Sequence, residues 1–443
     1  MGAAADSGPP TAAVVAADSS VGGHPRLAGW WIVAALAVTQ TVGYGVLYYA
    51  FAVLLQPMAD SLHASTATVT GALTASILAG AAMAVPVGRW LDRHGGRALM
   101  TTGSLAATGL VLAWSQVQSV AQLYAVLVGI GITTAMVLYE PALAVVVSWF
   151  PPHQRARAVL GVIAVAGFAS TIFMPLTGVL ADRYGWRTTL LILAAIHGAV
   201  TVPLHALAVR EPPRPAAQSR PPTARDRSLV VRAAVRDRRF WWLAVAFVAH
   251  GAAMAAMTVH LVGLLVHQGH SATFAATIAG LLGVLSVTGR LLLTGVQRRL
   301  SLTRAVAVVF TVQAAAAVVL LAVAGSTVGA AGAVVAFGVG FGVASLATPT
   351  LLADRYGTTV YATIAGILTT PITLAKATAP LGAAFLLTAG GYPVVLTGIG
   401  ACCLIAAVGI LAHATAPPPI PSLPPPADRD RAHFPATSRT ATR

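Results

Sequence analysis

Lysine is almost absent from this chain of 443 residues. Lys376 is the only one, so the other 26 of the 27 Lys and Arg residues are arginines. Phosphate-binding loops of the G-x-x-x-x-G-K-[ST] type need a lysine directly after a glycine, whereas Lys376 follows Leu-Ala. The sequence therefore excludes that route to ATP hydrolysis. It also lacks a paired acid–base or nucleophile constellation, so we expect neither an enzyme nor a cofactor.

Charge is scarce throughout the chain. Charged residues make up 9% and hydrophobic residues 57%, whereas a soluble domain carries about 25% charged residues. The apolar residues come in blocks of about 20, the length that a helix needs to cross a bilayer. The ~10-residue alternating segments of a transmembrane barrel are not seen. The class predicted is a polytopic α-helical protein of the lipid bilayer.

Cysteine and signal-peptide features are also few. Cys402 and Cys403 are adjacent in an apolar run, and we expect small buried side chains rather than a metal site. The first 28 residues lack a charged start followed by an apolar stretch and a cleavage site. We expect residues 1–28 and the proline-rich residues 414–443 to be disordered tails.

Twelve hydrophobic runs mark candidate spans. They cover residues 30–55, 68–90, 98–116, 121–148, 157–180, 188–209, 240–266, 273–296, 304–323, 327–352, 361–388 and 391–413. The longest connection, 210–239, is rich in proline and arginine and separates residues 29–209 from residues 240–413. The prediction is an all-α membrane protein with twelve transmembrane helices in two pseudo-symmetric halves of six.

Most arginines of the short turns fall on one side of the predicted spans. They are Arg89, Arg93, Arg97, Arg155, Arg157, Arg298, Arg299, Arg304 and Arg355. The turns on the other side contain only Arg183 and Arg187. Cytoplasmic loops are enriched in basic residues, so we predict cytoplasmic tails and a cytoplasmic linker in a bacterial inner membrane. This placement accounts for the net charge of +15 without a nucleic-acid partner.

The two halves repeat each other. Trp30-Trp31 begins the first span, and Trp241-Trp242 begins the seventh. Gly161 and Gly366 are each followed by a proline fourteen residues later, Pro175 and Pro380. A parallel repeat of two halves is the architecture of one large transporter class, in which the substrate binds between the halves near the bilayer midplane.

The turn after the second span carries a recognisable motif. Its sequence GRWLDRHGGRALM (Gly88–Met100) resembles the G-x-L-x-D-R-x-G-R/K signature of the major facilitator superfamily. The resemblance covers residues 30–413 and implies a gate at Gly88, Asp92, Arg93 and Arg97. Asp92 would pair with one of these arginines or with a helix end and release it when the halves rock. The corresponding turn of the second half has no acid in that position.

Two cations stand inside predicted spans. Lys376 lies fifteen residues into the run 361–388, about 18–22 Å from either membrane surface, on a face that also carries Thr373. Such charges usually face a cavity, although backbone carbonyls beside Pro380 offer an alternative partner. Arg290, one turn after Ser286, either faces the same cavity or extends to the membrane surface. Two cations without a local acid predict an anion site.

A narrower resemblance follows from these residues. Three features are similar to those of the monocarboxylate porter branch. They are the GWW that begins the first span, the arginine of VTGR (Arg290) and the basic residue of the eleventh span (Lys376). Within this branch, oxalate–formate antiporters hold oxalate with an arginine and a lysine at the last two of these positions. Ser286 stands where monocarboxylate porters have an aspartate, and the first span has no lysine. Both departures argue against simple proton–lactate symport.

Other polar residues are candidates for the same cavity. Glu140 is predicted to be a buried acid, either for proton coupling or gating or as a structural partner of Arg155 or Arg157. His260 repeats the position of Tyr49, nineteen residues after the first tryptophan of its half. We expect it to contact substrate or protons, or else to pack. Tyr48 and Tyr49 are expected to line the site.

The function predicted is secondary active transport of a small carboxylate anion by alternating access, with protons or a counter-anion as the coupled species. The protein is expected to be a monomer. One alternative is a proton-coupled exporter of hydrophobic drugs on the same fold. Another is a transport-inactive sensor or assembly partner.

Overall fold

The computed structural model describes residues 23–210, 223–297 and 299–414, and every regular element within these ranges is a helix. The elements are α1 (Gly23–Tyr44), η1 (Gly45–Tyr49), α2 (Ala50–Ser61), α3 (Thr66–His94), α4 (Gly96–Ser115), α5 (Val120–Val137), α6 (Tyr139–Trp149), α7 (Pro152–Ala166), α8 (Ala169–Ala208), α9 (Ala224–Arg236), α10 (Arg238–His267), α11 (Ala272–Val296), α12 (Leu302–Val323), α13 (Thr327–Gly338), α14 (Val343–Tyr356) and α15 (Tyr361–Ala414).

Polar caps start many of these helices. Side-chain oxygens of residues just before the first turn accept hydrogen bonds from backbone N–H groups two or three residues later, which satisfies donors that have no partner within the helix. Ser65, Ser119, Ser271, Ser301 and Ser326 cap α3, α5, α11, α12 and α13 in this way. The short polar turns of the sequence therefore fix where the apolar runs become helical.

The described residues contain nine continuous helical segments that are long and apolar enough to cross a membrane, or ten when the bent α11 is counted. Two of these segments are too long for one span: Pro152–Ala208, which contains α7 and α8, and Tyr361–Ala414, which is α15. Each contains a non-helical glycine, with φ of 76° at Gly185 in α8 and 74° at Gly391 in α15. A positive φ is readily adopted by glycine. Division at these glycines gives twelve spans, as the sequence predicts.

Packing shows that the chain turns back at both glycines. The second part of α8 runs antiparallel to α4, because His197 contacts Thr108 and His205 contacts Ser104. A Cβ on Gly398 would lie 3.5 Å from Leu386 Cδ1, whereas twelve residues of one straight helix would separate them by ~18 Å.

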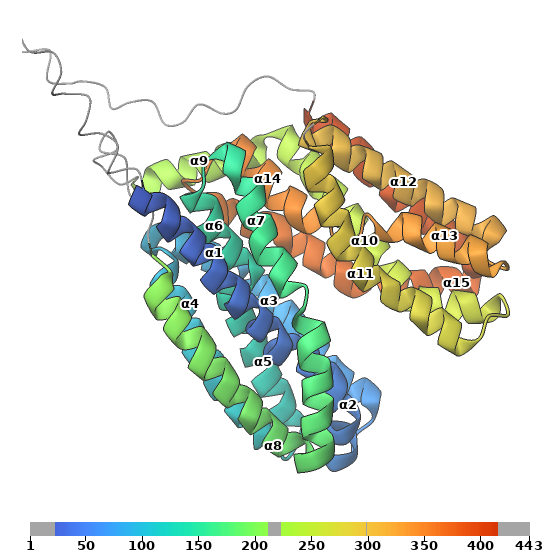
Figure 1. The fold of residues 1–443 in the computed structure, drawn as a ribbon, viewed down its shortest axis with the longest axis horizontal. Helices are drawn as coiled ribbons and strands as arrows, with labels where there is room; N and C mark the ends of the chain where they lie inside the picture. Colours follow the sequence, from blue (N-terminus) through green and yellow to red (C-terminus); the bar gives the residue numbers. More distant parts are fainter. Residues whose placement is uncertain (1–22, 211–222, 298, 415–443) are drawn as a thin grey trace, which may run out of the picture.

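The helices form two halves, α1–α8 and α10–α15, that meet at one end and diverge at the other (Figure 1). We name the meeting end, where α9 lies, the linker end and the opposite one the far end. Buried apolar side chains form one cluster within each half and a third at the linker end that includes residues of both halves, for example Val162 and Leu346. The closed contact between the halves is therefore apolar as well as polar.

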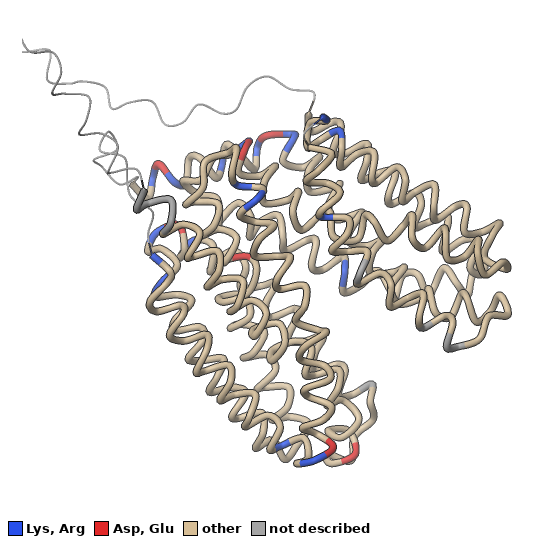
Figure 2. Tube along the Cα trace, viewed as in Figure 1, with Lys and Arg blue, Asp and Glu red and all other residues tan. Residues whose placement is uncertain are grey.

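Charged residues follow the same division. Lys, Arg, Asp and Glu gather at the linker end, a small group lies at the far end of the first half, and few lie between them (Figure 2). The proline- and arginine-rich linker contains helix α9, which begins with a reciprocal cap between Thr223 and Asp226. Helix α1 begins at Gly23, within the range expected to be a tail. Residues 1–22 and 415–443 lie outside the described residues.

Candidate functional site

A broken helix in each half approaches the space between the halves. The break between α5 and α6 leaves Leu138 in an extended conformation, and Gln40 Nε2 donates a 2.8 Å hydrogen bond to the Val137 carbonyl. Between α13 and α14, Gln313 Nε2 donates a 2.8 Å bond to the Phe337 carbonyl. Buried side-chain amides thus satisfy backbone groups that the breaks release. Discontinuous helices of this kind supply polar groups at membrane depth.

Arg290 of α11 is held at the start of α14. Its Nε donates to the Gly342 carbonyl at 3.3 Å and to Ser345 Oγ at 3.2 Å. No hydrogen bond to its two terminal nitrogens is recorded among the described residues. Gly342 permits this arrangement, because a Cβ there would lie 2.7 Å from Arg290 Nε and closer still to the Ser286 carbonyl. The guanidinium is therefore anchored through one nitrogen, and its other two remain for a ligand.

Lys376 of α15 packs along α10. A Cβ on Gly251 would lie 3.3 Å from both Cγ and Cε of Lys376, yet the lysine side chain is exposed. Within the described residues, no hydrogen bond to its ammonium is recorded. The carbonyl of Pro380 instead lies 3.1 Å from His260 Nε2. The structure thus offers no support for carbonyls beside Pro380 as the partners of Lys376.

The first turn of α6 lies near both cations. Tyr139 interacts electrostatically with Arg290, and Glu140 interacts with Lys376. These interactions cross between the halves, because α6 belongs to the first half and both cations belong to the second. Glu140 lies at the first turn of α6, and its side chain is accessible to solvent although it interacts with Lys376 of the other half.

Tyrosines from the first span complete this region. Tyr49 interacts with Arg290, and Tyr48 lies edge-on to Tyr49 with ring centroids 5.3 Å apart. Both belong to the π-helical turn η1, an element frequent at functional sites. Gly45, the first residue of this turn, is so close to the Phe173 ring that any Cβ would collide with it. The tyrosine positions therefore depend on the fit between η1 and α8.

The remaining candidates lie at the margins of this region. His260 is half-buried beside the Pro380 carbonyl and lines an apolar recess with Tyr392. Ser286 packs at Gly342 next to Arg290, and Thr373 is half-buried one turn before Lys376. His250 is buried, bonded to Gln313 Oε1 at 3.1 Å and stacked on Phe310. The roles of His260, Ser286 and Thr373 stay predictions.

The predicted gate lies at the linker end. Asp92 accepts hydrogen bonds from the backbone N–H groups of Ala362 and Thr363, at 3.0 and 2.8 Å. Of the two partners considered for Asp92, the structure shows the helix end. Gly88 is in such close contact with the Ala362 carbonyl that a Cβ would clash with it. Arg93 and Arg97 are exposed.

A second contact between the halves is an ion pair. Arg155 Nη1 of α7 lies 2.9 Å from Asp354 Oδ1 of α14. Arg155 therefore has a partner other than Glu140. The deepest recorded hydrogen bond between the halves runs from Thr370 Oγ1 to the Ala81 carbonyl at 3.2 Å, six residues before Lys376 and so about 9 Å along the helix. The exposed Lys376 thus lies beyond this contact, on the side toward the far end.

Some of these residues escaped the sequence analysis. Tyr139 adjoins Glu140 in the sequence. Its interaction with Arg290 could not be foreseen, because it depends on the break between α5 and α6. The glycines Gly338, Gly340 and Gly342 are the signal for the other break. Nothing in the sequence pairs Arg155 with Asp354. In the described part of the chain, no three His, Cys, Asp or Glu side chains are grouped to hold a metal ion.

Comparison with known proteins decides the family. Residues 36–375 match the family described as Major Facilitator Superfamily. The chain belongs to the major facilitator superfamily. It is therefore a multi-pass membrane transporter and not an enzyme, and the family resemblance and the fold predicted from sequence are confirmed.

Solved structures of this superfamily show the same fold. The E. coli fucose:proton symporter FucP aligns with a TM-score of 0.70 and 14% identity over 87% of this chain and 98% of that chain. The human organic anion transporter MFSD10 (TETRAN) aligns with a TM-score of 0.64 and 16% identity over 86% of this chain and 99% of that chain. A bacterial homologue of the iron transporter ferroportin, in an outward-facing state, aligns with a TM-score of 0.68 and 14% identity over 88% of this chain and 99% of that chain.

Two curated relatives match part of the chain. The uncharacterized MFS-type transporter YcxA of Bacillus subtilis (strain 168) is 25% identical over 43% of this chain and 46% of its own length. Monocarboxylate transporter 11 of Mus musculus is 32% identical over 39% of this chain and 38% of its own length. The matched region thus spans less than half of each relative.

Proposed function

We propose that this transporter moves a small carboxylate anion by alternating access at a site between its halves. The observation that carries the proposal is that Arg290 and Lys376 both approach the first turn of α6. A guanidinium binds a carboxylate through two parallel hydrogen bonds, and an ammonium supplies a compact charge beside it. The terminal nitrogens of Arg290 are placed for the first role and the exposed ammonium of Lys376 for the second.

The mouse relative lends support to the substrate class. It is named a monocarboxylate transporter, and its partial match to this chain is the stronger of the two in identity. The site also holds two bases and one acid, Glu140. A pocket for cationic hydrophobic drugs would need the opposite balance of charge.

Glu140 provides a route to proton coupling. When its carboxylate is ionised, it neutralises Lys376 and competes with the substrate. Once it accepts a proton, Lys376 becomes available to the substrate carboxylate, so one proton enters with one anion. If the transporter exchanges anions instead, the incoming anion replaces the outgoing one and Glu140 keeps its charge. Replacement by glutamine should therefore abolish proton-driven accumulation and spare exchange.

The linker end would be the cytoplasmic gate. Arginine-rich turns lie there, and such turns are typically cytoplasmic. Opening requires α3 to leave α15, which breaks the bonds from Asp92 to Ala362 and Thr363. Tyr48, Tyr49, Thr373 and Ser286 would then line the site, with His260 as a further contact for substrate or protons.

The test is uptake of labelled formate, lactate, pyruvate and oxalate into proteoliposomes at two imposed pH gradients. We expect flux of at least one carboxylate through the intact chain. Lys376→Ala should reduce it about 10- to 100-fold, the effect of losing one charge-assisted hydrogen bond. Lys376→Arg should retain more flux than Lys376→Ala, and Arg183→Gln, which removes a cation outside the site, should match the intact chain.

Two outcomes would reject the proposal. A folded Lys376→Ala protein with unchanged flux would show that the anion site is wrong, and export of hydrophobic compounds would become the leading function. Absence of flux for every carboxylate and every hydrophobic compound, from a folded intact chain, would favour the transport-inactive alternative.

A further inference from the structure

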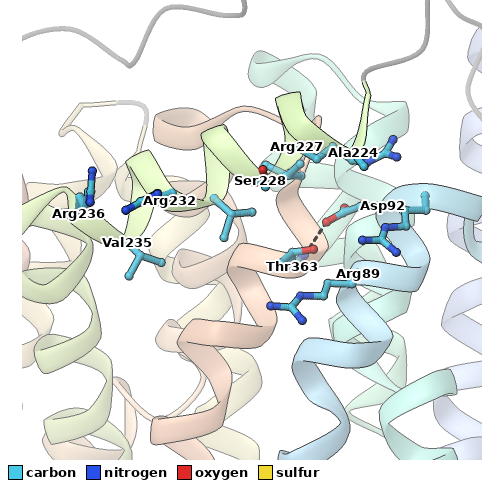
Figure 3. Close-up of a pocket in the computed structure, with 12 residues that line it drawn as sticks. Arg89, Asp92, Ala224, Arg227, Ser228, Arg232, Val235, Arg236 and Thr363 are labelled. Atoms are coloured by element: carbon cyan, nitrogen blue, oxygen red, sulfur yellow. Dashed lines mark hydrogen bonds between the residues drawn. The ribbon is translucent and has the colours of Figure 1, made fainter.

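A separate cavity lies at the linker end, away from the site between the halves. It has a volume of about 480 Å³, within the range of small-molecule sites. We name it the linker groove. Its lining comes from α3, α9 and the start of α15: Arg89, Asp92, Arg93, Ala224, Arg227, Ser228, Val231, Arg232, Val235, Arg236, Val360 and Thr363. Figure 3 shows α9 lying across the top of this groove, above Arg89 and Thr363.

One face of α9 forms the roof of the groove. The lining residues of this helix follow one another at spacings of one, three and four, so they share a face. An amphipathic helix normally turns an apolar stripe toward the protein, and here Val231 and Val235 do so. Arg227 and Arg232 interrupt that stripe, and Arg236 follows it. Three cations of α9 thus line the groove, and two of them, Arg232 and Arg236, are also exposed to solvent.

Charge in the linker groove is strongly unbalanced. Arg89 and Arg93 of α3 bring its arginines to five, and Asp92 is the one acid among its lining residues. Both oxygens of Asp92 already accept hydrogen bonds from backbone N–H groups of α15. Arg227 has an interaction of its own, and one carboxylate engaged in this way cannot neutralise the other four guanidinium groups, those of Arg89, Arg93, Arg232 and Arg236. The groove therefore has the electrostatics of an anion site.

We propose that the linker groove binds a phosphate-bearing anion. Arginine is the residue best suited to phosphate, because its planar fork binds two oxygens at once. The groove is larger than inorganic phosphate needs, and its lining extends along α9 from Ala224 to Arg236, which favours a ligand with two phosphates or with a phosphate on a larger group. A soluble phosphorylated compound and the headgroup of an acidic phospholipid share this chemistry.

The site depends on the conformation of the transporter. One wall is α3 of the first half and another is the start of α15 of the second half, joined by Asp92. When these helices separate, the groove loses a wall. A ligand that binds the closed form more tightly must stabilise that form by the same free energy. The ligand of the groove therefore acts as a regulator of opening at the linker end and not as cargo.

The experiment measures binding of ³²P-labelled pyrophosphate to the full chain in an uncharged detergent, by equilibrium dialysis at constant ionic strength set with chloride. We expect saturable binding that the double variant Arg232→Gln and Arg236→Gln weakens about tenfold or more. Arg225→Gln is the matched control, since Arg225 lies on the same helix and carries the same charge but does not line the groove. It should bind pyrophosphate as the intact chain does.

Competition identifies the natural source of the phosphate. Displacement of pyrophosphate by phosphatidylglycerol, and not by phosphatidylcholine, would support the site and assign it to a lipid headgroup. Displacement by neither would support the site and assign it to a soluble phosphate compound. Absence of saturable binding to the intact chain would overturn the proposal, as would an equal loss of binding in Arg225→Gln. Neither result depends on which substrate the transporter carries.

Discussion

The carboxylate of Asp92 accepts a 2.8 Å hydrogen bond from the backbone N–H of Thr363, which lies 271 residues further along the chain. Its other oxygen accepts a 3.0 Å bond from Ala362. Both donors belong to the first turn of α15, where N–H groups have no partner within the helix and negative charge is favoured. A side chain of the first half thus caps a helix of the second half at the linker end.

Asp92→Asn should loosen this contact. The amide loses the charge and keeps one acceptor oxygen, so one of the two charge-assisted bonds, worth about 1.5–3 kcal/mol, is lost. We expect the equilibrium between closed and open linker ends to shift by about tenfold or more. A cysteine at position 370, from Thr370→Cys, reports the shift, because Thr370 lies at the deepest recorded hydrogen bond between the halves.

The measurement is the rate at which a thiol reagent modifies this cysteine from the linker side, with Cys402 and Cys403 replaced by alanine. The rate should rise about tenfold in Asp92→Asn, in proportion to the open population. Asp182→Asn, which removes an acid at the far end, should leave the rate unchanged. If Asp92→Asn is modified at the same rate as the protein that carries only the cysteine changes, the Asp92 carboxylate does not hold the linker end closed.

Arg155 and Asp354 form an ion pair between the halves, and the environments of the two side chains differ. The Arg155 side chain is 6% exposed and that of Asp354 is 47% exposed. An unpaired buried charge is far more unfavourable than an unpaired solvated one. Asp354→Asn should therefore destabilise the closed protein by about 2–4 kcal/mol, whereas Arg155→Gln, which leaves an acid in water, should destabilise it by about 1 kcal/mol.

Thermal unfolding of both single variants and the double variant gives the comparison. Because the double variant removes both charges, it should be more stable than Asp354→Asn alone. Equal losses in the two single variants, with simple addition in the double variant, would indicate that the pair contributes no coupling energy.

Asp237 ties the linker to the second half and makes stability depend on pH. Burial acts to raise the pKa of Asp237, but hydrogen bonds from the Arg239 N–H and the Arg355 guanidinium outweigh it and hold the pKa below its ordinary value. A group with a depressed pKa stabilises the fold above its unfolded pKa of about 3.9 and loses that effect as the pH falls through the folded value.

Asp237→Asn removes the charge and keeps a good helix cap. The difference in apparent melting temperature between the intact chain and this variant should be present at pH 7 and shrink below about pH 4. Arg355→Gln should show the same pH dependence, since it removes the ion-pair partner at 3.1 Å. A difference that stays constant from pH 7 to pH 3 would contradict this role of Asp237.

Local signals in the sequence predict most of the fold. The apolar runs predict all the spans, because a bilayer demands about 20 apolar residues per helix, and Gly185 and Gly391 then turn the two longest helices back on themselves. The capping of another helix by Asp92 could be anticipated as one of two options, since the motif supplies an acid where a helix end of the other half must come near.

Features that depend on contacts between distant segments could not be predicted in this way. The fourth predicted span, residues 121–148, is one apolar run in the sequence, yet Gln40, ninety-seven residues before Val137, satisfies the carbonyl released by the break between α5 and α6. That break places Glu140 in the first turn of α6. Likewise, the sequence shows α9 only as part of a polar linker, because the other walls of the groove that it lines belong to α3 and α15.

Gly342 separates the effect of geometry from the effect of charge at the candidate site. A Cβ at this position would lie 2.7 Å from Arg290 Nε and 2.8 Å from Ser286 Oγ, so Gly342→Ala must push α11 away from α14. Overpacking of this kind destabilises a fold by about 1–3 kcal/mol. It should also lower carboxylate flux, because the guanidinium loses its anchor although its charge remains.

Gly295→Ala is the matched control for Gly342→Ala. Gly295 lies on the same helix as Arg290, and nothing stands within 4 Å of a Cβ there. Alanine in an open helical position should raise stability by about 0.4–1 kcal/mol and leave flux unchanged. Flux and melting temperature measured on the two variants decide the matter. If Gly342→Ala transports as well as Gly295→Ala, the position of Arg290 beside α14 is not what binds the anion, and its charge alone suffices.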